Sequence, residues 1–253
     1  MKRECVKCGH HWFWYLNDGR RKCRRCGQRQ SFKSVWDSSR LSEAAKRRLL
    51  EYFVLGVPAY RLRFRSPVSL EATERFFRLC RKVLALAEEF EQPFSGRIEC
   101  DEALFGGKRK GKRGWGAAGK VLVFGILQRN GRVKVFAVEG RGRDELLPLI
   151  CEHTTPGSLY YTDDWHAYAS LAVRGEHVVV TKEKGVPKGR DHINGIEGFW
   201  SYAKHWLYQY RGVPKKFFHF YLAETSFRFN HRDEDIYPLI YRLLKRTDIS
   251  EIR

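Results

Sequence analysis

The run Val121-Leu122-Val123-Phe124-Gly125-Ile126-Leu127 is followed, after Asn130-Gly131, by Val133-Lys134-Val135-Phe136-Ala137-Val138. Both runs are rich in β-branched and aromatic residues, and an Asn-Gly pair between two such runs is the strongest short-range signal for a β-hairpin. The sequence therefore predicts two neighbouring antiparallel strands. The sheet of this region must then be at least partly antiparallel.

Segments on both sides of this hairpin extend it into a domain. Working outward, the pattern predicts the order β-β-β-α-β-α-β and then a final helix, whose apolar residues recur at helical spacing. We expect an α/β fold over residues 96–235, with a mixed sheet and flanking helices. The expected elements are a strand over 97–100, the hairpin, a helix over 144–152, a strand over 159–161, a helix over 165–172, a strand over 177–180 and a helix over 194–206.

Acidic residues follow two of these strands, and another lies on the last helix. Asp101 ends the first strand, and Asp163 ends the strand that follows the first helix. Glu197 lies on the last helix, with Lys204 two turns further along the same face. A lone strand-end aspartate is usually a turn residue or a helix cap. Several carboxylates brought close together would instead favour a bound cation, because like charges repel one another. We expect Glu99 and Glu102 to be flanking surface or supporting residues.

Two C-x2-C pairs stand at the start of the chain, Cys5 with Cys8 and Cys23 with Cys26. This spacing is typical of a zinc ribbon, in which four thiolates complete a closed tetrahedral site for a structural Zn²⁺. Unligated buried cysteines are the alternative. We place the ribbon at residues 1–36 and expect the aromatic run 12–15 to form its small core.

Basic residues crowd the second cysteine pair, and more follow Asp101. They could contact phosphates or form a solvated face. The whole chain has 48 Lys and Arg against 29 Asp and Glu, a net charge of +19, which favours a polyanionic partner. The basic residues that we assign to DNA binding are Arg20, Arg21, Arg24, Arg25, Lys108, Arg109, Lys110, Lys112 and Arg113.

Residues 37–95 have helical periodicity, with Ser42 and Ser69 as expected N-caps. Helices joined by short turns suit a helix-turn-helix that reads a DNA groove, although a helical linker would share the pattern. Residues 236–253 are expected to form a helical tail. No apolar run approaches the length of a membrane span, and no signal peptide is recognisable. We therefore expect a cytoplasmic protein that does not associate with a membrane.

Three motifs, with the cysteine pairs, resemble a known family. Together they are similar to DDE transposases with an RNase H-like fold, and more narrowly to the insertion-sequence fifteen-ninety-five family, also called ISXO-two-like. These are bacterial and archaeal transposases that carry an N-terminal zinc ribbon. The resemblance runs from Cys5 to about Arg232, and its motifs are Asp-Glu-Ala-Leu-Phe-Gly-Gly-Lys (101–108), Tyr-Thr-Asp-Asp-Trp-His-Ala-Tyr (161–168) and His-Ile-Asn-Gly-Ile-Glu-Gly-Phe-Trp-Ser (192–201).

The resemblance implies catalysis with two Mg²⁺ (or Mn²⁺) ions about 4 Å apart. Asp101 would bridge both ions, Asp163 would bind one and Glu197 the other, while Lys204 would contact the DNA backbone. The family's Thr-Asp-acidic-Trp pattern favours Asp163 over its neighbour, Asp164. Asn194 is the alternative to Glu197, since related sequences can use Asn as the third ligand, but carboxylate chemistry prefers the glutamate.

The implied function is an insertion-sequence transposase of the cytoplasm and nucleoid. It would bind double-stranded DNA at terminal inverted repeats and at the target, then cleave and join strands. Synapsis of two ends predicts a homodimer or a higher oligomer. The alternatives are an RNase H-like nuclease without strand transfer, and a non-catalytic DNA-binding regulator derived from a transposase. The presence of all three acidic residues argues against the regulator.

Overall fold

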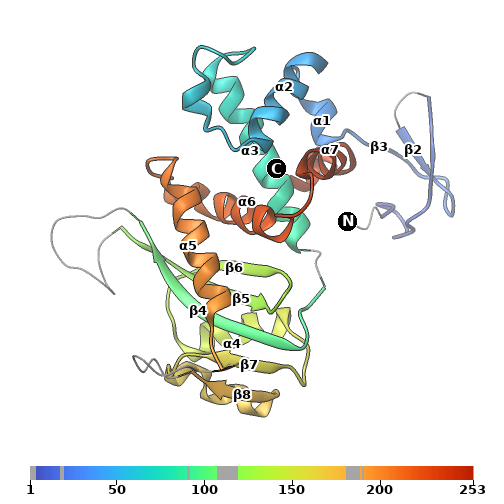
Figure 1. Cartoon of the computed structure of the whole chain (residues 1–253). Helices are drawn as coiled ribbons and strands as arrows, with labels where there is room; N and C mark the ends of the chain where they lie inside the picture. Colours follow the sequence, from blue (N-terminus) through green and yellow to red (C-terminus); the bar gives the residue numbers. More distant parts are fainter. Residues whose placement is uncertain are drawn as a thin grey trace. The chain divides into compact units, whose positions relative to one another are not determined.

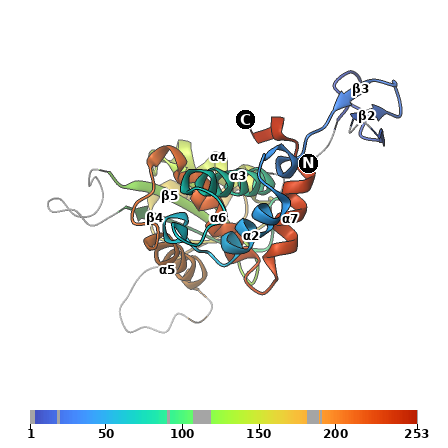
Figure 2. The same cartoon turned by 90° about the horizontal axis from the view of Figure 1, so that it is seen from above.

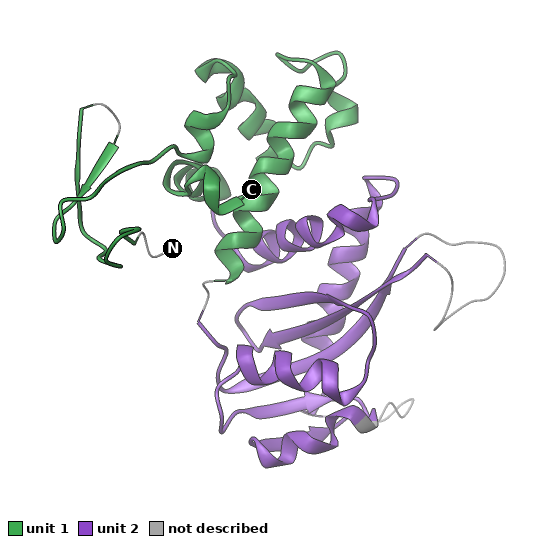
Figure 3. Cartoon of the chain, turned by 180° about the vertical axis from the view of Figure 1, so that it is seen from behind, with its two compact units in different colours: residues 1–90, 235–253 green, residues 91–234 purple. Residues whose placement is uncertain are grey.

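The computed structural model describes residues 4–17, 20–89, 92–106, 119–180, 189 and 191–252. The chain divides into two compact units, residues 1–90 with 235–253 and residues 91–234 (Figure 3). The basic stretch from Lys108 to Arg113 lies outside the described residues. Within the described part, no helix is both long and apolar enough to cross a membrane.

The second unit is built on a mixed five-stranded sheet of order β6-β5-β4-β7-β8 (Figure 1). Strands β4, β5 and β6 are antiparallel neighbours, and β7 and β8 run parallel to β4. The predicted hairpin and the mixed α/β class are confirmed, with Asn130 at a φ of 59° in the turn. The strands are β4 (Arg97–Phe105), β5 (Val121–Gln128), β6 (Val133–Val138), β7 (Leu159–Thr162) and β8 (Glu176–Val179).

The first strand is longer than the sequence predicted. β4 pairs with β5 along all but its first residue, from Ile98 opposite Gln128 to Phe105 opposite Val121. Asp101 therefore lies in the middle of the strand, opposite Gly125, and not at its end. The sequence does not reveal this extension because Asp101 and Glu102 interrupt the apolar pattern.

Helices cover both faces of the sheet. α5 and α6 lie over one face, where their apolar residues form a cluster with β4 and β5, while α4 and η2 pack on the other face (Figure 1). The segment expected as a helix over 165–172 is a 3₁₀ helix. The helices of this unit are α4 (Arg143–His153), η2 (His166–Val173), α5 (Asn194–Tyr208), η3 (Lys215–Phe217) and α6 (Phe218–Asn230).

Two glycines let α5 approach the sheet closely. A Cβ on Gly125 of β5 would lie 2.7 Å from the Trp200 ring, and a Cβ on Gly195 would lie 2.8 Å from a carboxylate oxygen of Glu99. Both distances are shorter than van der Waals contact permits, so a side chain at Gly125 would push the Trp200 ring and α5 away. A side chain at Gly195 would displace the Glu99 carboxylate from the helix. The close approach brings residues of α5 into direct contact with the acidic side chains of β4.

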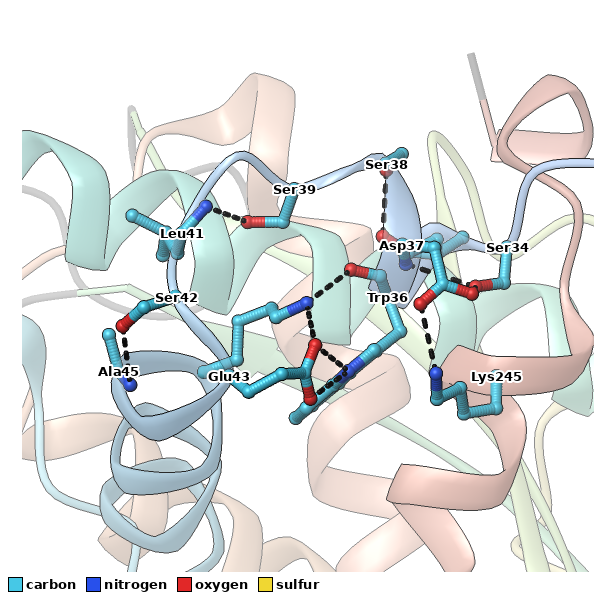
Figure 4. Close-up of polar contacts among 12 residues, drawn as sticks. Ser34, Trp36, Asp37, Ser38, Ser39, Leu41, Ser42, Glu43, Ala45 and Lys245 are labelled. Carbon is cyan, nitrogen blue, oxygen red and sulfur yellow. Dashed lines mark hydrogen bonds and ion pairs between the residues drawn. The ribbon is translucent and has the colours of Figure 1, made fainter.

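Two helices of the first unit begin at the expected caps, Ser42 and Ser69, and a third begins at Ser34, which was not predicted. Ser42 accepts a hydrogen bond from the backbone of Ala45, as Ser34 does from Asp37 (Figure 4), and Ser69 caps the longest helix. α3 packs against α2 and α7 (Figure 2). The helices are α1 (Val35–Ser38), α2 (Glu43–Val54), η1 (Ala59–Leu62), α3 (Leu70–Glu89), α7 (Ile236–Arg246) and η4 (Ile249–Ile252).

A small antiparallel sheet precedes these helices. It consists of β1 (Phe13–Tyr15), β2 (Arg20–Cys23) and β3 (Arg29–Ser31). Phe13 is buried with Cys5 and Cys23, but Trp12, Trp14 and Tyr15 are exposed. The expectation that the aromatic run forms the core is therefore wrong for three of its four residues. Because neighbouring residues of a strand face opposite sides, a continuous aromatic run in one strand cannot all face the same core.

Candidate active site and metal centres

The register of β4 and β7 brings two of the predicted carboxylates together. Glu99 pairs with Tyr161, and the same parallel register continued by two residues sets Asp163 beside Asp101. Carboxylate oxygens of Asp101, Glu102 and Asp163 all lie within 4.8 Å of one another. Hard oxygen ligands at such separations suit a divalent cation of the Mg²⁺ type. These three side chains could therefore hold a metal ion.

Asp163 also contributes to the local backbone. Its Oδ1 accepts a hydrogen bond from the backbone N–H of Trp165 at 3.1 Å. The turn-residue role that its sequence position allowed is thus present, and it fixes the carboxylate where β7 ends. Asp164 is exposed and does not belong to the carboxylate cluster.

Glu102 is the member of the cluster whose position the sequence did not predict. It is buried, which rules out the surface position that we allowed for it. The Nε of Arg141 lies 3.9 Å from its Oε1, and this oxygen has no hydrogen-bond partner among the described residues. Burial raises the pKa of Glu102 to about 7, although the Arg141 guanidinium acts in the opposite direction. Removal from water disfavours the charged form. The carboxyl group would therefore gain from a nearby cation.

α5 lies beside β4 and contacts the cluster through Trp200. Its Nε1 donates a hydrogen bond of 2.9 Å to Oδ2 of Asp101. Glu197, one turn earlier on the helix, is exposed and lies outside the three-carboxylate cluster, and Asn194 is also exposed. The sequence identified Trp200 as one of the apolar residues of the helix. Only the tertiary structure reveals its polar contact.

Lys204 lies one turn beyond Trp200. It is exposed, and its Nζ is 5.7 Å from the centre of the Phe105 ring at the end of β4. The lysine therefore lies on the side of α5 that faces β4. α5 runs alongside β4 in the same direction. Its first turn contacts Glu99, and Trp200 further along contacts Asp101 and Phe105.

The first turn of α5 is held by Glu99, a buried carboxylate. Oε2 of Glu99 accepts a 2.8 Å hydrogen bond from the backbone N–H of Ile196, and Oε1 accepts one of 2.7 Å from Nε of Arg129. The Arg129 guanidinium also donates to the carbonyl of His192 and stacks 3.7 Å from the Tyr161 ring centre. The surface position that we allowed for Glu99 is therefore ruled out, and the supporting role fits these contacts.

Replacing Glu99 with Ala should lower the free energy of unfolding by about 3 kcal/mol, because it leaves the largely covered Arg129 guanidinium and the Ile196 amide without their carboxylate partner. Urea denaturation of the full chain measures this loss. In hydrogen exchange, the Ile196 amide should lose protection. Exposed Glu139 of the same unit provides the control, since Glu139→Ala should change stability by about 0.5 kcal/mol or less. A Glu99→Ala protein as stable as this control would contradict the role of Glu99.

An open pocket of about 430 Å³ lies beside this first turn. Glu99 and Arg129 line it, and the carboxylate cluster does not. Its lining residues are Arg97, Glu99, Leu127, Arg129, Asn130, His192 and Gly195. The pocket and the carboxylate cluster are therefore separate features of this unit.

The four N-terminal cysteines form a second possible metal centre. Sγ of Cys5 lies 3.4 Å from Sγ of Cys26, and Sγ of Cys8 lies 3.7 Å from Sγ of Cys23. All four Sγ atoms lie within 4.8 Å of one another. Four sulfur ligands at these separations suit an ion with tetrahedral coordination. The predicted cysteine cluster is therefore present and could bind zinc.

The basic residues of the ribbon do not share one environment. Arg20, Arg24 and Arg25 are exposed. Arg21 is buried, stacked 3.9 Å from the Phe32 ring centre and 3.7 Å from a carboxylate oxygen of Asp248. The assignment of Arg21 to a DNA-facing surface is therefore wrong, because the alternation of β2 turns it to the inner side of the sheet.

The second unit thus has the RNase H-like arrangement, with a mixed sheet, helices on both faces and a carboxylate cluster where β4 and β7 meet. Residues 93–230 match the family described as the ISXO2-like transposase domain. The chain belongs to this family of transposases, as its motifs predicted. Membership supports a nuclease or transferase activity in general and implies the use of divalent metal.

Two individual proteins are similar to this chain to different degrees. An uncharacterized transposase-like protein of Haemophilus influenzae is 37% identical over 89 residues, which are 35% of this chain and 72% of the relative. A chain in the cryo-EM structure of the simian T-cell lymphotropic virus intasome in complex with PP2A regulatory subunit B56 gamma is 12% identical. That match covers 74% of this chain and 68% of the other, with a TM-score of 0.36.

Proposed function

We propose that this transposase binds double-stranded DNA at terminal inverted repeats, cleaves it and joins the cut end to target DNA. The observation that carries the proposal is the β4–β7 register, which sets Asp163 beside Asp101. Phosphodiester cleavage requires an activated oxygen nucleophile, a stabilised leaving oxygen and charge relief at phosphorus. Two Mg²⁺ (or Mn²⁺) ions supply these functions when bound.

In this proposal Asp101, Asp163 and Glu197 hold the ions. The donor set fits, because carboxylate oxygens are the ligands that Mg²⁺ prefers and the first two are already close together. The Trp200 indole keeps one oxygen of Asp101 in a fixed orientation. Glu102 is a further buried carboxyl group beside Asp101 and Asp163, and a cation bound there would favour its charged form.

DNA contacts would come from basic residues around this acidic site. Lys204, on the β4 side of α5, would contact the backbone, and Arg20, Arg24 and Arg25 would contact phosphates from the ribbon. A structural Zn²⁺ bound by the four cysteines would keep the ribbon folded. Because transposition brings two DNA ends together, a homodimer or higher oligomer would act on the DNA, in the cytoplasm and nucleoid.

A strand-transfer assay tests the proposal against the nuclease alternative. The full chain is incubated with Mg²⁺, a labelled pre-cleaved end and a circular target, and joined product is separated by size. We expect covalent joining of the end to the target. Hydrolysis without joining would favour the RNase H-like nuclease, and binding with neither reaction would favour the regulator.

A further inference from the structure

The small sheet of the ribbon has two chemically different faces. Trp14 pairs directly with Lys22, and Lys22 pairs directly with Arg29. Directly paired residues of neighbouring strands project from the same face, so these three side chains form one row across the sheet. All three are exposed, and 56% of Trp14 is accessible to solvent. We call this row, with Arg24, the outer face of the ribbon.

The opposite face is the one that closes on the cysteines. Phe13 pairs with Cys23, and both are buried with Cys5. Arg21 also belongs to this inner face and is stacked on Phe32. The residues of the strands that pack in the core and with the cysteine cluster therefore all belong to the inner face. Trp14 contributes to neither the core nor the cluster, although its large aromatic side chain would gain free energy from burial.

Cations surround the exposed indole. The guanidinium carbon of Arg24 lies 4.0 Å from the centre of the Trp14 ring. Lys22 is the direct neighbour of Trp14 on the next strand, and Arg29 lies one strand further, about 10 Å from Trp14 at the usual strand spacing. A half-exposed aromatic ring beside a row of positive charges matches a planar group attached to a chain of negative charges.

We infer that the outer face binds single-stranded nucleic acid, with an unpaired base stacked on Trp14 and backbone phosphates on Lys22, Arg24 and Arg29. Aromatic side chains next to a basic groove are the recurring means of binding single strands. In a duplex, both faces of each base are covered by neighbouring bases, so stacking on Trp14 requires an unpaired base. The inference deepens the proposed function, on which it rests for the identity of the nucleic acid as DNA.

Fluorescence anisotropy of the full, zinc-loaded chain with labelled oligothymidine of about 12 nucleotides tests the inference. We expect Trp14→Ala to weaken this binding about 5- to 160-fold, which corresponds to the free energy of about 1–3 kcal/mol for one stacked base. Binding of a mixed-sequence duplex should change by about twofold or less. Lys22→Ala should lower the salt slope for the single strand by about 0.7, since it removes one phosphate contact.

Tyr15→Ala is the matched control. Tyr15 is adjacent in the same strand and 70% exposed, but it pairs with Arg21 and therefore belongs to the inner face. It should leave oligothymidine affinity within about twofold. Unchanged zinc content in both variants shows that the ribbon is folded. Equal effects of the two substitutions, or no binding of oligothymidine by the unaltered protein, would overturn the inference.

Two further probes distinguish DNA from RNA and from an acidic protein as the ligand of the outer face. Oligouridine bound as tightly as oligothymidine, with the same loss in Trp14→Ala, would support the nucleic-acid site and extend it to RNA. Polyglutamate that competes equally well would overturn it in favour of an acidic protein partner. If strand transfer succeeds while single-strand binding fails, the inference is wrong and the proposed function stands. If oligothymidine binds through Trp14 but strand transfer fails, the proposed function is wrong and the single-strand site stands.

Discussion

Replacing Asp101 with Asn should abolish DNA cleavage and strand transfer while leaving duplex binding largely intact. Asn has the same shape and keeps an oxygen that can accept the hydrogen bond from Nε1 of Trp200. The change therefore removes a charge without removing this contact. Charge stabilisation by metal ions accounts for several kcal/mol of a phosphoryl-transfer barrier, and each 1.36 kcal/mol is a factor of ten. We expect a loss on the order of 10³-fold or more.

The measurement is cleavage of a labelled duplex in Mg²⁺, with duplex affinity followed by anisotropy. Asp144→Asn makes the same charge change at an exposed position in the first turn of α4, and it should retain full activity. An Asp101→Asn protein that keeps more than about a tenth of the activity would remove Asp101 from the proposed site, since loss of a metal ligand costs more than one factor of ten.

The same assay decides between neighbouring ligands. Asp163→Asn should be as inactive as Asp101→Asn, whereas Asp164→Asn should remain active, because only Asp163 lies in the carboxylate cluster. Glu197→Gln should be inactive and Asn194→Ala active for a different reason, because only the glutamate carries the charge that the ions need. The reverse result at either pair would assign the ligand to the residue that the sequence offered as the alternative.

Local signals were sufficient to predict many elements of both units. The Asn130-Gly131 turn determines the hairpin, and alternation of apolar runs with turn residues determines the order of the remaining elements. Ser42 and Ser69 cap helices as expected, because an N-cap depends on backbone groups only two or three residues away. These features require no knowledge of distant parts of the chain.

The contacts of the site depend on tertiary register and could not be predicted in this way. That Glu102 is buried beside Asp163, or that Trp200 donates to Asp101, follows from how β7 and α5 align with β4. A one-residue change of register would turn these side chains to the other face. The sequence allowed either a surface or a supporting position for Glu99. The structure shows that its carboxylate accepts a hydrogen bond from the first turn of α5.

The ribbon shows the same limit on a smaller scale. The cysteine spacing predicted the cluster, because two tight turns suffice to gather four thiolates. The exposure of Trp14 and the burial of Arg21 reverse the order expected from hydrophobicity. Both follow from strand alternation once Phe13 and Cys23 are assigned to the inner face. In a module with so few apolar residues, the metal is expected to replace the missing core.

Replacing Cys23 with Ser should therefore abolish zinc binding and unfold the ribbon. Cys23 is buried, its Sγ lies 3.7 Å from that of Cys8, and it accepts a hydrogen bond from the backbone N–H of Arg25. In small zinc modules the binding free energy, about 10–16 kcal/mol, is the free energy of folding. No comparable source of stability remains, because Phe13 is the one large apolar side chain buried with the cysteines in the described ribbon.

Zinc content and hydrogen exchange measure the effect. Amides of β1 and β2 should lose protection, while those of β4 and β5 should keep it, because the second unit has its own apolar clusters on both faces of the sheet. Cys151→Ser, at an exposed free cysteine of α4, should change neither quantity. Full protection of β1 and β2 in zinc-free Cys23→Ser would mean that side-chain packing alone holds the ribbon. The four thiols would then be ordinary structural cysteines, the alternative that their spacing left open.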